Sequence, residues 1–249
     1  MRRAAFAAGL TGLVGAAATR PVPAAALLGP PAFTGAPAVG AHTTLDALLA
    51  TMPPVAPRAW VQYVMGSGVR YLKKIGYGRE LTSLGTLAFI ETQIGSDEAT
   101  CNPNTIKKGY LETGRYGDLL QPHDISRYVM KAGTTFLLVN ATRADTLWLL
   151  DEDNLYSPRP ARVTDVRADT VALRRRSFAT RRISLAFAGG GDQALRTMTL
   201  WLTPAIPNGI AKLHATTAGG GPFDLRIDAF GNAYSSLVDA SFDALRAQG

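Results

Sequence analysis

The sequence has very little cysteine and little charge. One cysteine, Cys101, among 249 residues rules out an intrachain disulfide framework. Charged residues make up 18% of the chain and hydrophobic residues 47%, a balance that excludes a disordered polyelectrolyte and indicates a folded body with a sizeable core. No apolar run after the N-terminal region approaches the ~20 residues that a membrane-spanning helix needs.

Several readable functional motifs are also missing. There are three histidines and no Cys-x-x-Cys or His-Glu-x-x-His spacing, so we expect no metal and no cofactor. Neither a phosphate-binding Gly-Lys-Ser/Thr loop nor a Gly-x-Ser-x-Gly elbow occurs. Gly189–Ala194 fits a Gly-x-Gly-x-x-Ala pattern, but a strand is expected after it, which favours a hairpin turn over a dinucleotide site. Absence of these motifs does not exclude catalysis, so an enzyme stays an alternative, while a non-enzymatic protein is favoured.

The N-terminus resembles an export signal. Arg2 and Arg3 precede an uncharged stretch over residues 4–18 that is rich in Ala, Leu, Gly and Val and too short to span a bilayer. Small residues at 16–18 and 24–26 offer two cleavage positions, and no cysteine is placed for a lipid anchor. The sequence predicts a signal peptide over residues 1–26 and an exported protein, periplasmic or extracellular.

Removal of this signal changes the charge of the chain. The formal net charge is +7, and loss of Arg2, Arg3 and Arg20 lowers the Lys plus Arg count from 26 to 23 against 19 acids, which leaves +4. Much of the basicity therefore belongs to targeting, and nucleic acid is not expected as a partner.

The next stretch, residues 27–58, is predicted to be a linker. Eight of the 15 prolines fall between Pro21 and Pro57, and proline disfavours long helices and central strands. Within it Thr44 is suited to cap a short helix that ends at Met52. The rest of the chain, residues 59–249, is predicted to form a single β-dominated domain.

From Trp60 onward the pattern of apolar residues has a period of two, typical of antiparallel strands with Gly-rich turns. Helical spacing is expected only over Asp118–Lys131 and, more firmly, over Tyr234–Arg246. The predicted fold class is mainly β (α+β): a curved antiparallel sheet with a C-terminal helix and one or two short helices. The predicted strands are 60–65, 69–75, 86–94, 134–139, 146–150, 177–187, 195–202, 210–216 and 223–229.

The stretch from Leu195 to Gly231 has a distinctive rhythm: an alternating strand that contains Trp201, the turn Thr203–Gly209, then two strands that close at Phe230 and Gly231. This rhythm resembles the lipoprotein-carrier superfamily of exported bacterial proteins. The resemblance implies a half-barrel that wraps a helix and holds an acyl chain or another apolar ligand in its concavity. It covers about 40 residues and does not extend to residues 95–133, so no functional residue is carried over from it.

One segment is strongly basic. Arg159–Arg182 holds eight arginines and two aspartates, a local charge of +6, while the remainder of the exported chain is near −2. Guanidinium groups bind phosphate and carboxylate with two-pronged geometry, so Arg174, Arg175 and Arg176 are candidates to hold an anionic headgroup, an acidic polysaccharide or an acidic protein. The alternative is a solvated edge strand, whose charges prevent association with other sheets.

Large aromatic residues fall on separate predicted strands. If they shared one concave face, they would line a pocket for a lipid-like ligand. The alternative is an ordinary hydrophobic core, which any closed sheet needs. The candidates are Trp60, Phe89, Phe136, Trp148, Phe187 and Trp201.

Cys101 offers a competing, enzymatic interpretation. A hydrolase would need His123 as base and Asp124 as orienting acid, brought to Cys101 by the fold. A structural thiol is the alternative, because no known signature surrounds the cysteine and the acids near it raise a thiol pKa. The leading hypothesis is an exported envelope protein that binds an apolar or amphiphilic ligand. The other two hypotheses are the hydrolase and a structural or assembly module of the envelope.

Overall fold

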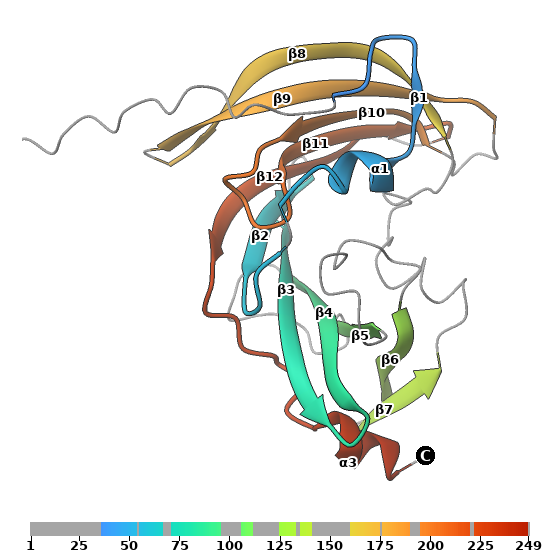
Figure 1. Ribbon diagram of the computed structural model, residues 1–249, viewed down its shortest axis with the longest axis vertical. Coiled ribbons are helices and arrows are strands. Elements are labelled where there is room, and N and C mark those ends of the chain that lie inside the picture. Colours follow the sequence, from blue (N-terminus) through green and yellow to red (C-terminus); the bar gives the residue numbers. More distant parts are fainter. Residues whose placement is uncertain are drawn as a thin grey trace, which may run out of the picture.

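The computed structural model describes residues 36–53, 55–66, 71–95, 106–111, 125–132, 135–140, 160–174, 176–189, 195–219 and 222–248. Within these residues twelve strands form one antiparallel sheet with two short helices, α1 (Leu45–Leu49) and α3 (Phe242–Arg246) (Figure 1). The strands are β1 (His42–Thr43), β2 (Trp60–Met65), β3 (Tyr71–Thr82), β4 (Gly85–Gly95), β5 (Lys107–Leu111), β6 (Ile125–Ala132), β7 (Thr135–Asn140), β8 (Ala161–Leu173), β9 (Arg176–Phe187), β10 (Leu195–Leu202), β11 (Ile210–Thr217) and β12 (Pro222–Gly231).

Two meanders make up the sheet. Strands β8 to β12 and strands β2 to β7 each run in sequence order, and the pairing of β12 with β2 joins them into one sheet. Strands β7 and β8 therefore lie near opposite edges, although they are consecutive in the chain. Figure 1 shows that the sheet is curved and open. The predicted fold class, a curved antiparallel sheet with few short helices, is confirmed.

Alternation of side chains explains the strands. On β10, Met198, Leu200 and Leu202 are buried, whereas Thr199 and Trp201 between them are only half-buried. Successive side chains of a strand point to opposite faces, so one face of β10 meets the core and the other meets solvent. The bounds of this strand match the prediction, and it pairs antiparallel with β9; residues 190–194, in the turn predicted between these strands, lie outside the described residues.

Helix α1 packs on the concave side of the sheet. The Thr44 hydroxyl accepts from the Ala47 N–H at 3.2 Å and caps the helix, as predicted. Leu45, Leu48 and Leu49 of α1 are buried in one cluster with apolar residues of β2 and β8 to β12. Burial of each leucine contributes about 2 kcal/mol to folding.

The stretch predicted as a linker is therefore partly folded. Met52 and Val55 join the same core as α1, and His42 and Thr43 pair with β8. The many prolines exclude a long helix, as expected, but they do not prevent a short helix and an irregular segment from packing on the sheet. The described part of residues 27–58 thus packs against the sheet and does not lie free.

Both helix predictions need correction. Ile125–Ala132 is strand β6, paired with β5 and β7, and residues 118–124 lie outside the described residues. The C-terminal helix is confirmed only for Phe242–Arg246, with Ser241 as its N-cap. Residues 232–241 follow the outer face of the sheet, opposite to α1. We call residues 232–248 the C-terminal segment.

Candidate functional site

A row of directly paired residues crosses five strands on the outer face. Arg167 of β8 pairs with Arg182 of β9, which pairs with Trp201 of β10; Trp201 pairs with Lys212 of β11, and Lys212 pairs with Arg226 of β12. Directly paired residues project on the same side of a sheet. We call these five residues the cation row, because four cations flank one tryptophan.

The two ends of the cation row differ in their counterions. On β8 and β9, Asp165 lies 3.6 Å from Nε of Arg167 and 3.3 Å from Nη2 of Arg182. Neither Lys212 nor Arg226 forms an ion pair within the part of the chain that the structure describes. Like charges directly opposite each other destabilise a sheet. The end of the row formed by Lys212 and Arg226 is therefore suited to binding an anion that is not part of the protein.

Nearby acids offset part of this charge without forming an ion pair with Lys212 or Arg226 in the described part of the chain. The Asp224 carboxylate lies 2.9 Å from Nδ1 of His214, and the Asp228 carboxylate accepts from Nε2 of Gln62 at 3.0 Å. Both aspartates thus have partners other than Lys212 and Arg226. Nη2 of Arg226 contacts the Ala172 carbonyl at 3.5 Å, a long and weak hydrogen bond.

Trp201 holds the middle of the row in place. Its indole N–H donates to Asp169 of β8 at 2.8 Å, across the intervening strand β9. Nζ of Lys212 lies 4.5 Å from the centre of the Trp201 ring. The indole donor, followed by the Thr170 N–H, holds the pKa of Asp169 below its ordinary value. Asp169 therefore stays ionised, and its charge is directed at Trp201.

A groove of about 490 Å³ lies at the Lys212 and Arg226 end of the row. The tip of the β8–β9 hairpin forms one of its walls and bends onto β12, where the Phe178 and Phe230 rings meet edge to face at 5.9 Å. Three cations and two carboxylates line the groove together with apolar residues. The lining residues are Val64, Gly66, Leu173, Arg174, Lys212, Asp224, Leu225, Arg226, Ile227 and Asp228.

The tip of the β8–β9 hairpin contains an arginine in a left-handed backbone conformation. Leu173 pairs with Arg176, so the loop between β8 and β9 has two residues, Arg174 and Arg175. Arg174 has φ +52°, the left-handed region in which Gly or Asn is normally found in such loops. Arg174 therefore carries its guanidinium on a backbone conformation that favours glycine, at the wall of the groove.

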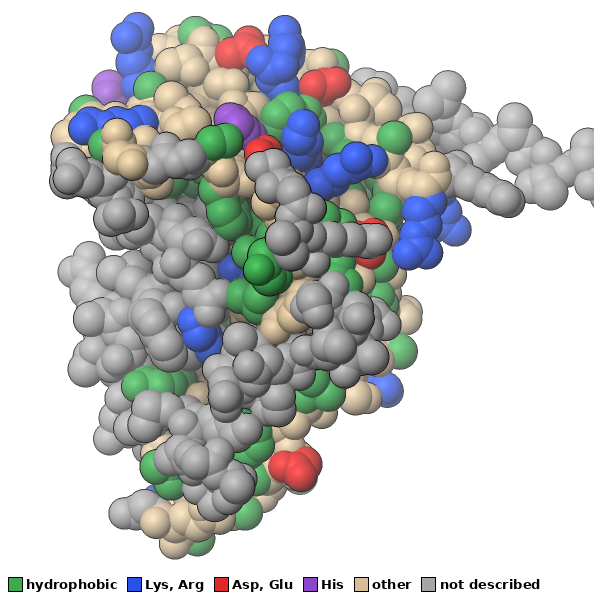
Figure 2. Space-filling model, turned by 180° about the vertical axis from the view of Figure 1, so that it is seen from behind, with side chains coloured by type: hydrophobic (Ala, Val, Ile, Leu, Met, Phe, Trp, Pro, Cys, Tyr) green, Lys and Arg blue, Asp and Glu red, His purple; other side chains and the backbone are tan. Residues whose placement is uncertain are grey.

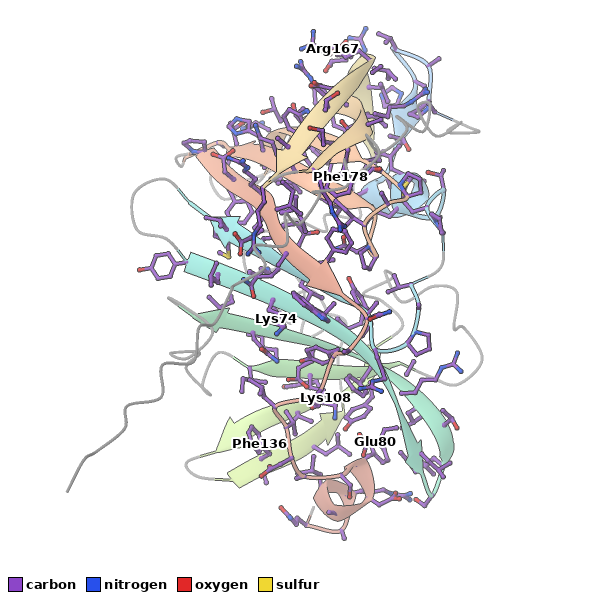
Figure 3. All side chains as sticks on the ribbon, turned by 90° about the vertical axis from the view of Figure 1, so that its left-hand side faces the viewer. Lys74, Glu80, Lys108, Phe136, Arg167 and Phe178 are labelled. Carbon is purple, nitrogen blue, oxygen red and sulfur yellow. The ribbon has the colours of Figure 1, made fainter. Side chains whose placement is uncertain are left out.

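Figure 2 shows the distribution of charge. Lys and Arg side chains gather over the upper part of the molecule, where β8 to β11 lie, and they are fewer in the lower part. Figure 3 places Arg167 near the top of this region and Phe178 beside β12. The Lys and Arg side chains of the described residues seen in this view are therefore concentrated on the β8–β12 meander.

The lower part of the same face is sealed by the C-terminal segment. Glu91 is fully buried and accepts from the Ser236 hydroxyl and, at 2.9 Å, from the Leu237 N–H. Gln93 donates to Glu91 at 2.9 Å and to the Tyr234 hydroxyl at 2.6 Å. Each of these buried polar groups has a partner, which is the arrangement of a structural network.

An ion pair between Glu80 and Lys108 also holds the C-terminal segment on this face. Glu80 accepts from Nζ of Lys108 at 3.1 Å, from the Tyr110 hydroxyl at 2.9 Å and from the Phe242 N–H (Figure 3). Burial, followed by the negative charge of Glu80, raises the pKa of Tyr110 far above its ordinary value. The tyrosine is therefore a permanent donor, and this half of the face holds the C-terminal segment rather than a ligand.

The structure separates the aromatic residues predicted to line one pocket. Phe187 lies in the core with α1, whereas Phe89 is buried, and Trp60 and Phe136 are partly buried, in a second cluster under the C-terminal segment. Trp201 lies in the cation row, and Trp148 lies outside the described residues. The described aromatic residues thus do not share one concave face, because the register places Trp60 opposite Gly76 on the outer face.

The predicted cationic residues divide as well. Arg174 lines the groove, Arg176 begins β9 as an exposed residue, and Arg175 lies outside the described residues. The edge-strand alternative applies to β8, because β1 pairs only with its first two residues. Strand β9, which carries Arg181 and Arg182, is interior.

Cys101, His123 and Asp124, the residues of the predicted hydrolase, also lie outside the described residues. In the described part of the chain, no group of three or more His, Cys, Asp or Glu side chains could hold a metal ion. No helix there is both long and apolar enough to cross a membrane.

The sequence prediction missed Lys212 and Arg226. Each lies on a predicted strand, so the alternation indicated that each side chain faces outward. Their direct opposition depends on the register between β11 and β12, in which Lys212 pairs with Arg226. The wall formed by Leu173 and Arg174 depends on the bend of the hairpin onto β12. A charged residue at an outward position on each of two predicted neighbouring strands was the only signal that could have found this site.

Comparisons with known proteins give structural likeness alone. No family model matches, and no curated protein matches. A hypothetical protein of Chlamydia trachomatis matches with a TM-score of 0.41 and 7% identity, over 80% of this chain and 98% of that one. A Bacteroides fragilis protein named as exported, with a YmcC-like fold, matches with a TM-score of 0.36 and 10% identity, over 72% and 98%. A Parabacteroides distasonis protein named as a lipoprotein matches with a TM-score of 0.34 and 9% identity, over 72% and 97%. None of these names identifies a lipoprotein carrier.

Proposed function

We propose that the chain is an exported, non-enzymatic envelope protein that binds an amphiphilic ligand in the groove on its outer face. The signal predicted for residues 1–26 supports export. The observation that carries the binding proposal is the direct opposition of Lys212 and Arg226 in the lining of this groove, with neither cation in an ion pair with another described residue.

The head of the ligand is anionic. Lys212 and Arg226 supply donors from neighbouring strands, and Arg174 supplies a third cation from the hairpin wall. Charge-assisted hydrogen bonds from guanidinium and ammonium groups to phosphate or carboxylate are about twice as strong as neutral ones. A bound anion also removes the repulsion between Lys212 and Arg226, so binding relieves a cost of the unliganded sheet.

The apolar part of the ligand is small and lies in the groove. Val64 and Leu173 are half-buried and provide apolar surface beside the cations. A volume of about 490 Å³ is within the range of small-molecule sites and accommodates a head with a short apolar portion. Helix α1 packs on the concave side of β10 to β12. The carrier resemblance implies a ligand in that concavity, whereas this proposal places the ligand in the groove on the outer face.

Titration with a short-chain phosphatidic acid, kept below its critical micelle concentration, tests the proposal. We expect saturable binding with a change in tryptophan fluorescence, because Trp201 is in contact with Lys212. Phosphatidylcholine of the same chain length serves as the control ligand and should bind weakly. An organic extract of the purified protein, examined by mass spectrometry, should contain an anionic amphiphile.

A matched set of variants makes the test specific. The double substitution Lys212→Gln and Arg226→Gln should weaken phosphatidic acid binding about tenfold or more. Arg196→Gln removes an exposed arginine of β10 that does not line the groove, and it should leave binding unchanged. Equal binding of the two lipids, or equal loss in the two sets of variants, contradicts the proposal.

A further inference from the structure

The β3–β4 hairpin ends in an exposed apolar tip. Leu81, near the end of β3, is 84% exposed, and Leu84, within the turn Thr82–Gly85, is 47% exposed. Single exposed leucines are common on protein surfaces, but two on one narrow turn form a projecting apolar feature. Figure 1 shows that this tip lies beside α3 at one end of the long axis of the molecule.

The tip is held rigidly. The Thr82 hydroxyl donates to the Gly85 carbonyl at 2.7 Å and accepts from the Leu84 N–H at 3.1 Å. The Ser83 N–H and hydroxyl both donate to the Asp243 carboxylate of α3, the shorter contacts being 2.8 and 2.6 Å. The two leucines are therefore presented to solvent by a fixed turn that is tied to α3.

Two exposed arginines lie near the leucines, against one exposed carboxylate, Asp243, which accepts hydrogen bonds from Ser83. Arg79 is exposed and lies two residues before Leu81 on the same face of β3. Exposed Arg246, at the end of α3, reaches the Ser83 hydroxyl at 3.5 Å. Asp243 is engaged by Ser83, and the Glu80 carboxylate by Lys108 and Tyr110. Two leucines rimmed by two arginines match the chemistry of a lipid surface, with an apolar interior and anionic headgroups.

We propose that this hairpin tip inserts into the interface of a bilayer that contains anionic lipids. Two leucines cannot supply the ~800 Å² per partner of an ordinary protein interface, but they are enough to enter the headgroup layer. The tip lies on the opposite meander from the cation row. This inference goes beyond the proposed function, because it concerns a bilayer surface and does not depend on the groove.

Vesicle flotation tests the inference with the full chain after removal of residues 1–26. We expect binding to vesicles of phosphatidylcholine mixed with phosphatidylglycerol and little binding to phosphatidylcholine alone. The double substitution Leu81→Ser and Leu84→Ser should reduce the bound fraction about tenfold. Leu237→Ser is the matched control, because Leu237 is 49% exposed on the C-terminal segment away from the tip, and it should bind normally. Circular dichroism checks that each variant is folded.

Insertion depth gives a second readout. Tryptophan emission from a Leu81→Trp variant should be quenched by brominated lipids, while that from Leu237→Trp should not. Arg79→Gln with Arg246→Gln should weaken binding about fivefold per arginine at low salt. Normal flotation of the Leu81 and Leu84 double variant, or equal quenching at the two positions, overturns the inference. The Leu81 and Leu84 double variant should still bind short-chain phosphatidic acid, because neither leucine lines the groove, so failure here is distinguishable from failure of the groove proposal.

Discussion

Lys212 on β11 and Arg226 on β12 lie directly opposite each other, and neither forms an ion pair with a carboxylate in the described part of the chain. Such a pair lowers the stability of a sheet, by a fraction of ~1 kcal/mol when solvent is close. Its presence beside a groove supports the proposed binding role. A residue that serves only the fold is expected to stabilise it.

Arg226→Gln should make the unliganded protein slightly more stable. The substitution removes the repulsion with Lys212, and only a weak contact with the Ala172 carbonyl is lost. We expect the free energy of unfolding in urea to rise by about 0.3 kcal/mol at low salt, and the gain to vanish at high salt. Arg196→Gln provides the baseline. A clear loss of stability would show that Arg226 has a structural role.

Arg174→Gly should also stabilise the protein while it weakens ligand binding. Arg174 has a left-handed backbone conformation that costs an L-residue about 1 kcal/mol and costs glycine very little. After allowance for the flexibility of glycine in the unfolded chain, we expect a gain of about 0.5 kcal/mol in urea denaturation. Arg176→Gly, in the adjoining strand, should instead lose about as much. Equal losses in the two variants would refute the assignment of strain.

The pH dependence of stability should report the hydrogen bond between Trp201 and Asp169. The pKa of Asp169 is lower in the folded protein than its ordinary value of 3.8, so the carboxylate stabilises the fold above that pH. This contribution is lost as the pH falls through the folded pKa. Trp201→Phe should therefore cost about 1 kcal/mol at neutral pH, and the cost should shrink in acid.

The matched experiment uses Asp169→Asn. In that background the effect of Trp201→Phe should no longer vary with pH, because the titrating group is gone. Urea denaturation at neutral and acidic pH measures all four proteins of the cycle. If the cost of Trp201→Phe is the same at both pH values in the native background, the tryptophan acts by packing alone.

Local patterns predicted most strands and mispredicted the segments whose structure depends on distant partners. The run at 195–202 alternates without interruption, and its predicted bounds match β10. Ile125 and Tyr128 have helical spacing, yet their segment is a strand because β5 and β7 take up its backbone hydrogen bonds. Residues 234–241 have apolar residues at helical spacing, but they do not form a helix. The Ser236 hydroxyl and the Leu237 N–H instead donate to Glu91 of β4. Partners that are distant in the sequence cannot be identified from a local pattern of residues.

The candidate site was only partly predictable for the same reason. The density of arginines identified Arg174, because clustering is visible in a linear sequence. Lys212 and Arg226 are 14 residues apart, and their opposition is created by the register of two strands. The groove also needs the bend of the β8–β9 tip onto β12, where Phe178 meets Phe230. Register and bend are properties of the assembled sheet.

The contact between Gly76 and Tyr234 should prove essential for the position of the C-terminal segment. A Cβ at Gly76 would lie 2.1 Å from the Tyr234 ring, so the ring occupies space that only glycine leaves open. Gly76→Ala should cost about 2 kcal/mol in the free energy of unfolding, because the segment must shift. Tyr234→Ala loses the hydrogen bond to Gln93 and the packed ring. In that background Gly76→Ala should be nearly neutral, which a double-mutant cycle would measure as a coupling of about 2 kcal/mol. Strict additivity of the two substitutions would mean that the ring does not rest on Gly76 in solution.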